Sequence, residues 1–378
     1  MSGEIRLRGE WDGRTAAAGD DAATLSRVRL GARAELRPWL SAFVQLQDAR
    51  AWGTETNTAA DGTADQLDLH QGYVDLRALG LTARLGRQEL ALSDERLVGP
   101  LLWANTTRTF DGAVFGHEHA RGEVRLFWMN VAERDALIAV GVDPQANEGD
   151  DQDGWFMGGF LAHRLGASAR AEVMFLHDRN AVTDKSYTAW GRFYGRAGDI
   201  LYDGSGAYQF GADREAFQAS GRLGLAVGPR GSLALQLDVL SGDADTLDAT
   251  RKAFASLYGT GHLFHGYMDY FLDFPRQTVQ AGLIDAIARL VAPVPQPWTL
   301  LADLHYFALA AERNGQRGLG VEGDVILGRA LVPGATVEAG GSVFVPRDLV
   351  GTILPAFAGG TDDPTYWGYV MLTVRFPQ

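Results

Sequence analysis

Hydrophobic and polar residues alternate one by one along most of this 378-residue chain. The segment from Leu25 to Leu36 shows the alternation best. Its apolar positions are Val28, Leu30, Ala32, Ala34 and Leu36, and the positions between them are Arg27, Arg29, Gly31, Arg33 and Glu35. Successive side chains of a β-strand point to opposite faces, whereas a helix would spread these charges around its whole circumference. The pattern therefore predicts strands with one apolar and one polar face.

Eighteen segments with this alternation follow one another along the chain. They cover residues 3–11, 24–36, 39–50, 66–77, 80–90, 108–117, 121–131, 154–164, 167–178, 184–194, 200–211, 214–227, 231–242, 277–291, 298–310, 318–331, 335–345 and 365–376. A further apolar segment, Phe264 to Phe271, would make the number of strands odd. We assign it to a long outer loop that could fold inward.

Along the chain, short connections between these segments alternate with connections that are mostly long. Short connections such as Arg37-Pro38 and Val332 to Gly334 alternate with polar stretches such as Ala132 to Asp153 and Asp243 to Arg276. Outer-membrane barrels have short turns on their periplasmic side and longer loops on the extracellular side. The last segment ends in the aromatic residue Phe376, which suits the closing strand of such a barrel.

These patterns predict an all-β fold, a transmembrane antiparallel β-barrel of about 18 strands with short periplasmic turns and long extracellular loops. We expect a single domain over residues 1–378. A barrel of this size is too wide for side chains to fill, so its lumen should hold water. Its outer face should contact outer-membrane lipid and lipopolysaccharide, with Trp11, Trp128 and Tyr306 as interfacial aromatics. The most apolar stretch, Ala281 to Val291, is too short and too charged for a membrane helix.

Composition and charge narrow the possible functions. The chain has no cysteine, which excludes disulfides and thiolate chemistry. A formal net charge of −13 argues against nucleic-acid binding. No secretory signal precedes the first strand-like segment. We interpret the chain as the mature form of an exported protein of the bacterial outer membrane; the alternative is a cytoplasmic protein.

Arginine dominates the basic residues, since only Lys185 and Lys252 are lysines among 34 basic positions. A GC-rich genome would explain this preference. A need for a permanently charged, planar group that binds carboxylates through two N–H donors would explain it too. Alternation places ten arginines on the lumen side of the predicted strands: Arg6, Arg8, Arg27, Arg29, Arg33, Arg84, Arg125, Arg170, Arg192 and Arg222. Acids share this side. Cross-strand pairs of arginine and carboxylate would stiffen the wall. Arginines with free N–H donors would instead provide a row of binding sites for an anionic solute.

The sequence carries none of three common motifs of catalytic sites. It contains no Gly-x-Ser-x-Gly nucleophile elbow, no His-Glu-x-x-His metal motif and no Gly-rich phosphate loop. We therefore expect a protein that is not an enzyme and needs no cofactor. Asp150, Asp151 and Asp153 are a weak Ca²⁺ candidate, but they lack the spacing of a calcium loop. A solvated acidic loop is the preferred interpretation.

The order and spacing of several short motifs resemble the alginate export family of outer-membrane porins over nearly the whole chain. The motifs are LRPW at 36–39, LGRQEL at 85–90, RTFDG at 108–112, YDGSGAYQFG at 202–211, SGD at 241–243, LYGTGHLFHGYMD at 257–269, LHYF at 304–307, E-x-D at 322–324 and VRF at 374–376. The resemblance implies a monomeric 18-stranded barrel with an arginine-rich constriction that conducts the polyanion alginate out of the periplasm. It also implies that Arg84, Arg87 and Arg108 line the lumen or the constriction.

The same motifs imply which side chains orient these arginines. They are Asp111, Asp269, His305, Glu322 and Asp324, and Asp303 on the lumen face is expected to act in the same way. The chain departs from the family in having no long periplasmic connection that could act as a plug, and its lumen acids nearly match its lumen arginines. The expected function is a channel for an anionic polysaccharide such as alginate or a related uronate. The alternatives are a small-solute uptake porin of the same architecture, a barrel enzyme or adhesion module, and a soluble all-β protein.

Overall fold

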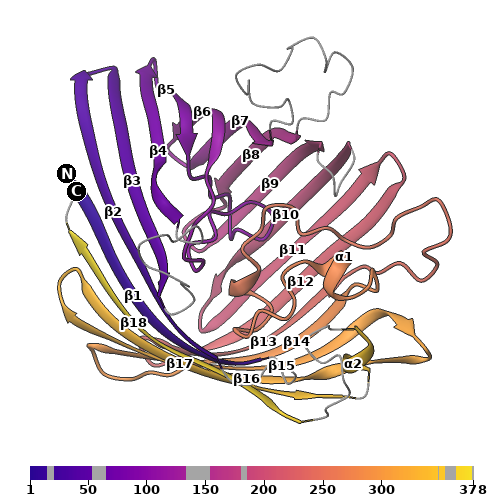
Figure 1. The fold of residues 1–378 in the computed structure, drawn as a ribbon. Helices are drawn as coiled ribbons and strands as arrows, with labels where there is room; N and C mark the ends of the chain where they lie inside the picture. Colours follow the sequence, from indigo (N-terminus) through magenta and orange to yellow (C-terminus); the bar gives the residue numbers. More distant parts are fainter. Residues whose placement is uncertain are drawn as a thin grey trace, which may run out of the picture.

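A computed structural model describes residues 1–14, 21–52, 65–132, 154–179, 185–347, 349–353 and 363–376. Eighteen antiparallel strands form one sheet that closes into a barrel (Figure 1). The strands are β1 (Ser2–Gly13), β2 (Asp21–Arg37), β3 (Leu40–Trp52), β4 (Asp65–Ala78), β5 (Leu81–Gln88), β6 (Phe110–His119), β7 (Gly122–Ala132), β8 (Gly154–Arg164), β9 (Ala169–Arg179), β10 (Ser186–Ala197), β11 (Ile200–Gly211), β12 (Arg214–Val227), β13 (Gly231–Leu240), β14 (Leu283–Val291), β15 (Trp298–Arg313), β16 (Gln316–Val332), β17 (Ala335–Pro346) and β18 (Thr365–Phe376). The predicted fold is confirmed.

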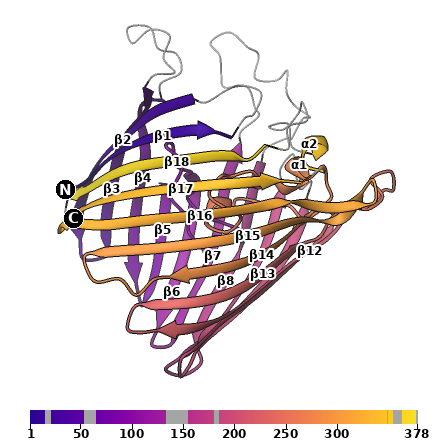
Figure 2. The ribbon, with the colours of Figure 1, turned by 90° about the horizontal axis from the view of Figure 1, so that it is seen from below.

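The first and last strands close the barrel. Ile5 on β1 lies opposite Val28 on β2 and also opposite Val374 on β18. The two ends of the chain are therefore neighbours, as Figure 2 shows. Closure gives every strand two partners, so that no row of backbone N–H and C=O groups is left unpaired in hydrocarbon.

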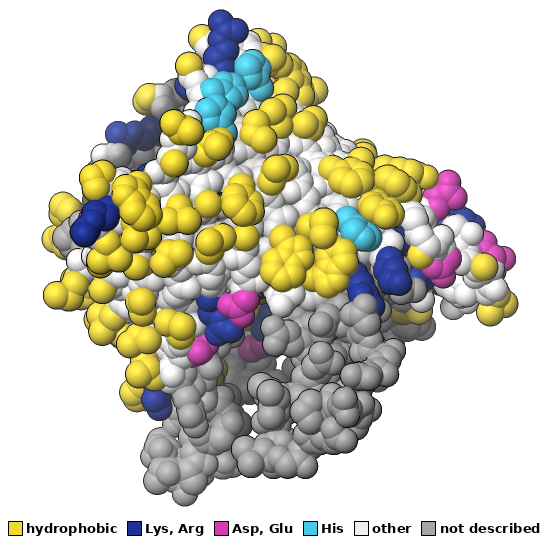
Figure 3. Space-filling model, turned by 90° about the horizontal axis from the view of Figure 1, so that it is seen from above, with side chains coloured by type: hydrophobic (Ala, Val, Ile, Leu, Met, Phe, Trp, Pro, Cys, Tyr) yellow, Lys and Arg dark blue, Asp and Glu magenta, His cyan; other side chains and the backbone are white. Residues whose placement is uncertain are grey.

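The two faces of the wall have opposite character. On the outside, Leu30 and Leu235 are 61% and 67% exposed, whereas Arg6 and Arg27 on the inside are each 3% exposed. Figure 3 shows one side of the outer wall, where hydrophobic side chains are spread widely and charged ones gather toward the margins. Soluble proteins have the reverse arrangement. An apolar outer band is what a barrel presents to lipid.

One predicted strand begins later than expected. The segment predicted at 277–291 becomes strand only at Leu283, because the short helix α1 (Phe274–Gln277) precedes it. Val279 and Gln280 have φ values of 49° and 60°. These left-handed conformations are incompatible with an extended strand.

Two long connections fold into the interior of the barrel (Figure 1). We call residues 89–109, between β5 and β6, the first inner loop, and residues 241–282, between β13 and β14, the second inner loop. The segment from Phe264 to Phe271 is part of the second inner loop. It packs a buried apolar core against the wall, in which Phe271, Phe307 and Phe344 are all fully buried. The lumen at this level thus contains protein as well as any water.

The remaining helices are short: η2 (Gly261–Leu263) and α2 (Val350–Ile353). In the part of the chain that the structure describes, no helix has the length and apolar character needed to cross a membrane.

Candidate functional site

Strand alternation directs four arginines of β1 and β2 into the barrel. Arg6 and Arg27 lie opposite each other in the register of the two strands, and Arg8 and Arg29 flank them. All four are buried. Arg8 and Arg27 form ion pairs of 2.6 and 2.7 Å with Glu10 and Glu4, respectively. Burial of these charges is therefore offset by carboxylates on the same strands.

These four arginines hold the first inner loop against the wall. Arg6 donates to the carbonyl oxygens of Leu102 and Ala104 at 2.8 and 2.9 Å, and Arg8 donates to that of Trp103 at 2.7 Å. Arg6 forms no ion pair within 4 Å among the described residues, and carbonyl oxygens accept its hydrogen bonds. The loop thus closes over the N-terminal arginines and prevents them from facing an open lumen.

Glu89 fixes the start of the first inner loop. Its carboxylate lies 3.2 Å from the guanidinium of Arg29 and 2.8 Å from the imidazole Nε2 of His70. Burial favours the neutral acid, but the hydrogen bond with His70 and the charge of Arg29 outweigh burial. The net result is a lowered pKa for Glu89. The carboxylate stays ionised and keeps the loop anchored.

The two inner loops join across the lumen. Val98 and Tyr258 form an isolated parallel bridge, and the Arg108 guanidinium donates to the carbonyl oxygens of Gly99 and Tyr258. Thr260 donates to Glu95 at 2.9 Å. Burial raises the pKa of Glu95 and lowers that of Arg108. Arg108, predicted to line the lumen or constriction, lies where the loops meet.

An aromatic stack reinforces this junction. The rings of Trp103 and His262 are parallel with centroids 4.2 Å apart, and the Arg8 guanidinium lies 4.1 Å from the Trp103 ring centre. Asp269, predicted to orient an arginine, instead contacts His262 at 2.8 Å. The junction combines stacking, cation–π and charge-assisted contacts, each of which favours one fixed geometry.

Nearer the short turns, arginines from different strands share carboxylates. Asp75 on β4 contacts Arg33 at 3.1 Å and Arg84 at 2.7 Å. Asp203 on β11 contacts Arg192 at 2.6 Å and Arg222 at 3.1 Å. At Asp75, one carboxylate between two guanidiniums leaves an excess positive charge and unused N–H donors. At Asp203 the balance differs, because Arg192 also lies 3.7 Å from Asp94.

The third shared carboxylate belongs to Glu123 on β7. It contacts Arg125 at 2.6 Å and Arg170 at 3.5 Å, and Arg170 also contacts Glu172 at 3.0 Å. The side chains of Arg125 and Arg170 are about one-third exposed, unlike the buried Arg6 and Arg8. These arginines are within reach of solvent.

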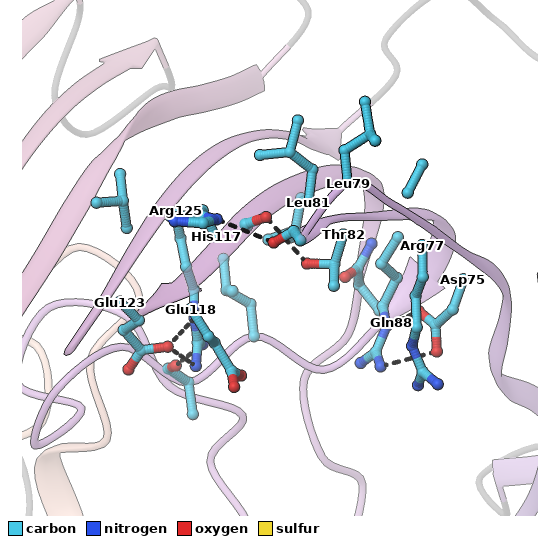
Figure 4. A pocket seen from close by; sticks show the side chains of 18 of the residues that line it. Asp75, Arg77, Leu79, Leu81, Thr82, Gln88, His117, Glu118, Glu123 and Arg125 are labelled. Carbon is cyan, nitrogen blue, oxygen red and sulfur yellow. Dashed lines mark hydrogen bonds and ion pairs between the residues drawn. The ribbon is translucent and has the colours of Figure 1, made fainter. Parts of the chain in front are cut away.

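A cavity of 690 Å³ is lined by Asp75 and Arg84 and also by Glu123 and Arg125 (Figure 4). The turn at Leu79 and Gly80 borders one side, and the start of the first inner loop borders the other. A smaller cavity of 130 Å³ is lined by Asp203, Arg192 and Arg222. Arg96 and Arg289 also line it. Both cavities present guanidinium groups to water.

Arg87 and Asp111 lie on the outer face of the wall. They contact each other at 2.8 Å and are 38% and 53% exposed. Arg87 follows Arg84 by three positions, and side chains alternate along β5, so the two arginines project from opposite faces. The neighbouring Phe115, on the same face as Asp111, is also exposed.

The wall formed by β13 to β16 carries buried acids. Asp303 contacts Arg289 at 2.6 Å, and His305 contacts Asp285 at 3.0 Å. Glu322 accepts a hydrogen bond from the backbone N–H of Met268 at 2.9 Å. Asp324 accepts one from Ser342 at 2.5 Å. Among these predicted residues, Asp303 is the one that pairs with an arginine within the described part of the chain; Glu322 fastens the second inner loop.

Sequence reasoning missed several residues of this interior. Arg96 crosses the lumen from the first inner loop to Asp238 on β13, at 2.9 Å. Asp75 and Asp203 were not singled out, although each faces inward by alternation. The signal that could have identified them is their register position opposite Arg84 and Arg222, respectively. Asp150, Asp151 and Asp153 lie outside the described residues. Within the described ranges, no group of three or more His, Asp or Glu side chains could hold a metal ion.

Comparison with known proteins gives a family match and several structural neighbours. A family model described as "Alginate export" matches residues 1–273. No curated protein sequence matches the chain. Among solved structures, Acinetobacter baumannii OccAB1 has a TM-score of 0.68 at 14% identity, with 99% of this chain and 95% of that chain covered.

Two structures from Pseudomonas aeruginosa are also similar. OccK8 (OprE) has a TM-score of 0.67 at 12% identity, covering 100% of this chain and 98% of that chain. OpdK, crystallised with vanillate, has a TM-score of 0.63 at 13% identity, covering 99% of this chain and 98% of that chain. At such low identity these likenesses establish the fold alone.

Proposed function

Because this chain belongs to the alginate export family of outer-membrane channels, we propose that its barrel conducts an anionic saccharide, such as alginate or a related uronate, past inward-facing arginines. The observation that carries this proposal is the sharing of single carboxylates by two arginines. It is clearest at Asp75, between Arg33 and Arg84. Glu123 and Asp203 are also shared, although Arg170 has a second partner in Glu172 and Arg192 has one in Asp94. A uronate carries one carboxylate per sugar ring, which an arginine can bind through two parallel hydrogen bonds.

The distribution of exposure supports this role. Arg33, Arg84, Arg125, Arg170 and Arg222 have side chains that are roughly one-third exposed. They combine a permanent charge with access from the lumen, whereas Arg6, Arg8 and Arg27 hold the first inner loop. We therefore assign solute contact to the exposed set. Arg87, on the outer face, is left out of the pathway.

A second candidate function is uptake of small solutes. The observation that favours it is the junction of the two inner loops through Val98, Arg108 and Tyr258, which narrows the lumen. The structural neighbours from the Occ group fit this alternative as well, since OpdK was crystallised with vanillate. Both candidates use the same barrel and differ in the size and charge of the solute.

Planar-bilayer recording of the purified protein tests both candidates. An anion-favouring reversal potential, with block by oligouronates and weaker block by a neutral glucan of equal length, is expected. Cation selectivity without oligouronate block would contradict the proposal. Permeation by monomeric carboxylates or neutral sugars, without block by oligomers, would favour the small-solute channel.

A further inference from the structure

The inner face of β10 carries an uncharged polar row in its extracellular half. Ser186, Thr188 and Trp190 occupy alternate positions and are 0%, 1% and 4% exposed. The row continues toward the short-turn end with Arg192 and Tyr194. Gln218 on β12 lies close by, because its register partner on β11, Ala207, is also the partner of Trp190.

Several polar atoms in this row have no hydrogen-bond partner among the residues that the structure describes. They are the hydroxyl oxygens of Ser186 and Thr188, the indole nitrogen of Trp190, and both amide atoms of Gln218. Buried polar atoms are nearly always paired, because burial removes the water that would otherwise bind them. Several unpaired atoms in one patch call for a specific explanation.

The second inner loop covers this patch. Gln209, between Thr188 on β10 and Ala216 on β12, both donates to the Ala255 carbonyl and accepts from the Ala255 N–H, at 2.9 Å each. Tyr258 donates to Asp178 at 2.6 Å. Phe254 packs in the same buried cluster as Trp190. The cover thus contacts the wall through the Ala255 backbone, Phe254 and the Tyr258 hydroxyl, and none of these satisfies the unpaired atoms.

The space that the structure describes beside Gln218 is too small for a solute. The cavity that touches Gln218 has a volume of 20 Å³, enough for about one water molecule. Any larger ligand of the row requires residues 253–258 to move away from the wall.

We propose that the inner face of β10, with Gln209 and Gln218, is a binding track for the hydroxyl groups of a saccharide chain, covered in this structure by residues 253–258. This inference rests on the proposed function and extends the pathway beyond its arginines. Hydroxyl and amide groups both donate and accept, as sugar hydroxyls do, and the indole offers an N–H and a ring face. The paired bonds of Gln209 to Ala255 show that its amide is placed to hold a neighbouring donor and acceptor, such as two adjacent sugar hydroxyls.

The track and the arginines would bind different groups of a uronate, namely its hydroxyls and its carboxylate. Arg222, near the short-turn end of β12, belongs to the exposed set and offers charge for the carboxylate. Ser186, Thr188 and Trp190 offer neutral contacts for the ring hydroxyls. A neutral saccharide should therefore use the track but gain little from the arginines.

The test is block of single-channel current by oligouronates and by a neutral oligosaccharide, in the variants Ser186→Ala and Thr188→Val. Each change removes an unpaired hydroxyl group and nearly keeps the side-chain shape. Block by both sugars should weaken by about fivefold, with sugar-free conductance and melting temperature not lowered. Thr24→Val on the outer face of β2 is the matched control and should leave block unchanged. Unchanged block in both track variants would overturn the proposal.

A further variant tests the cover. Gln209→Leu removes both bonds to Ala255 and should raise the frequency of open events in the absence of sugar. Unchanged opening would show that residues 253–258 do not act as a cover. If no saccharide blocks the wild-type channel, the proposed function fails; if the wild type is blocked and the variants are blocked equally, the track alone fails.

Discussion

Replacing Asp75 by asparagine tests whether shared carboxylates set the charge of the pathway. Asp75 lies between Arg33 and Arg84, so Asp75→Asn would raise the local charge from about one to two positive units while retaining the amide oxygen as an acceptor. Both arginines are roughly one-third exposed, so water screens the added charge. At about 4 Å in water, a unit charge attracts a solute carboxylate by ~1 kcal/mol, roughly a fivefold change in binding.

The assay is bilayer recording with a salt gradient, followed by titration with an oligouronate. Asp75→Asn should shift the reversal potential toward anions and tighten block by about fivefold, and the gain should shrink as salt is raised. Asp111→Asn is the matched control. Asp111 also pairs with an arginine of β5, Arg87, but on the outer face. Equal effects of the two substitutions, or no effect of Asp75→Asn, would refute the assignment of Asp75 to the pathway.

Three other predictions address the wall and the inner loops. Leu235→Arg, near the middle of β13 on the lipid face, should destabilise the barrel by ~2–4 kcal/mol in urea unfolding from vesicles, and a loss below ~1 kcal/mol would contradict a lipid-facing position. Arg108→Ala removes the donor that joins the inner loops at Gly99 and Tyr258, so single-channel conductance should rise; unchanged conductance would mean that the junction does not limit flow. Burial raises the pKa of Glu95, so contact between the loops is strongest below the ordinary carboxyl pKa and weakens as pH rises through the raised value. Conductance should therefore increase with pH across that window, and a dependence that persists in Glu95→Gln would exclude Glu95 as its source.

Alternation along the sequence was sufficient to identify the strands, because each inward or outward position is decided locally. The same rule separates Arg84 from Arg87: their spacing of three places them on opposite faces of β5, although the family resemblance groups them together. The strand predicted from 277 starts late because a helical turn with left-handed residues precedes it. The alternation of apolar and polar residues carries no information about backbone conformations of that kind.

The inner loops could not be derived from the sequence. Their residues follow no period, and their positions depend on contacts between distant segments, such as Arg6 with Leu102 and Arg108 with Tyr258. The sharing of Asp203 by Arg192 and Arg222 likewise depends on the register of three adjacent strands. Sequence alternation predicts which face a residue occupies, but tertiary structure decides which neighbour it meets.

The pairing of β1 with β18 has a consequence for biogenesis. Ile5 and Val374 can meet only after nearly the whole polypeptide has been synthesised. Until then the growing sheet has two open margins, and bare margins promote aggregation in water and cannot be tolerated in lipid. Because β1 gains its second partner only from β18, both open margins disappear in the same step, when the barrel closes.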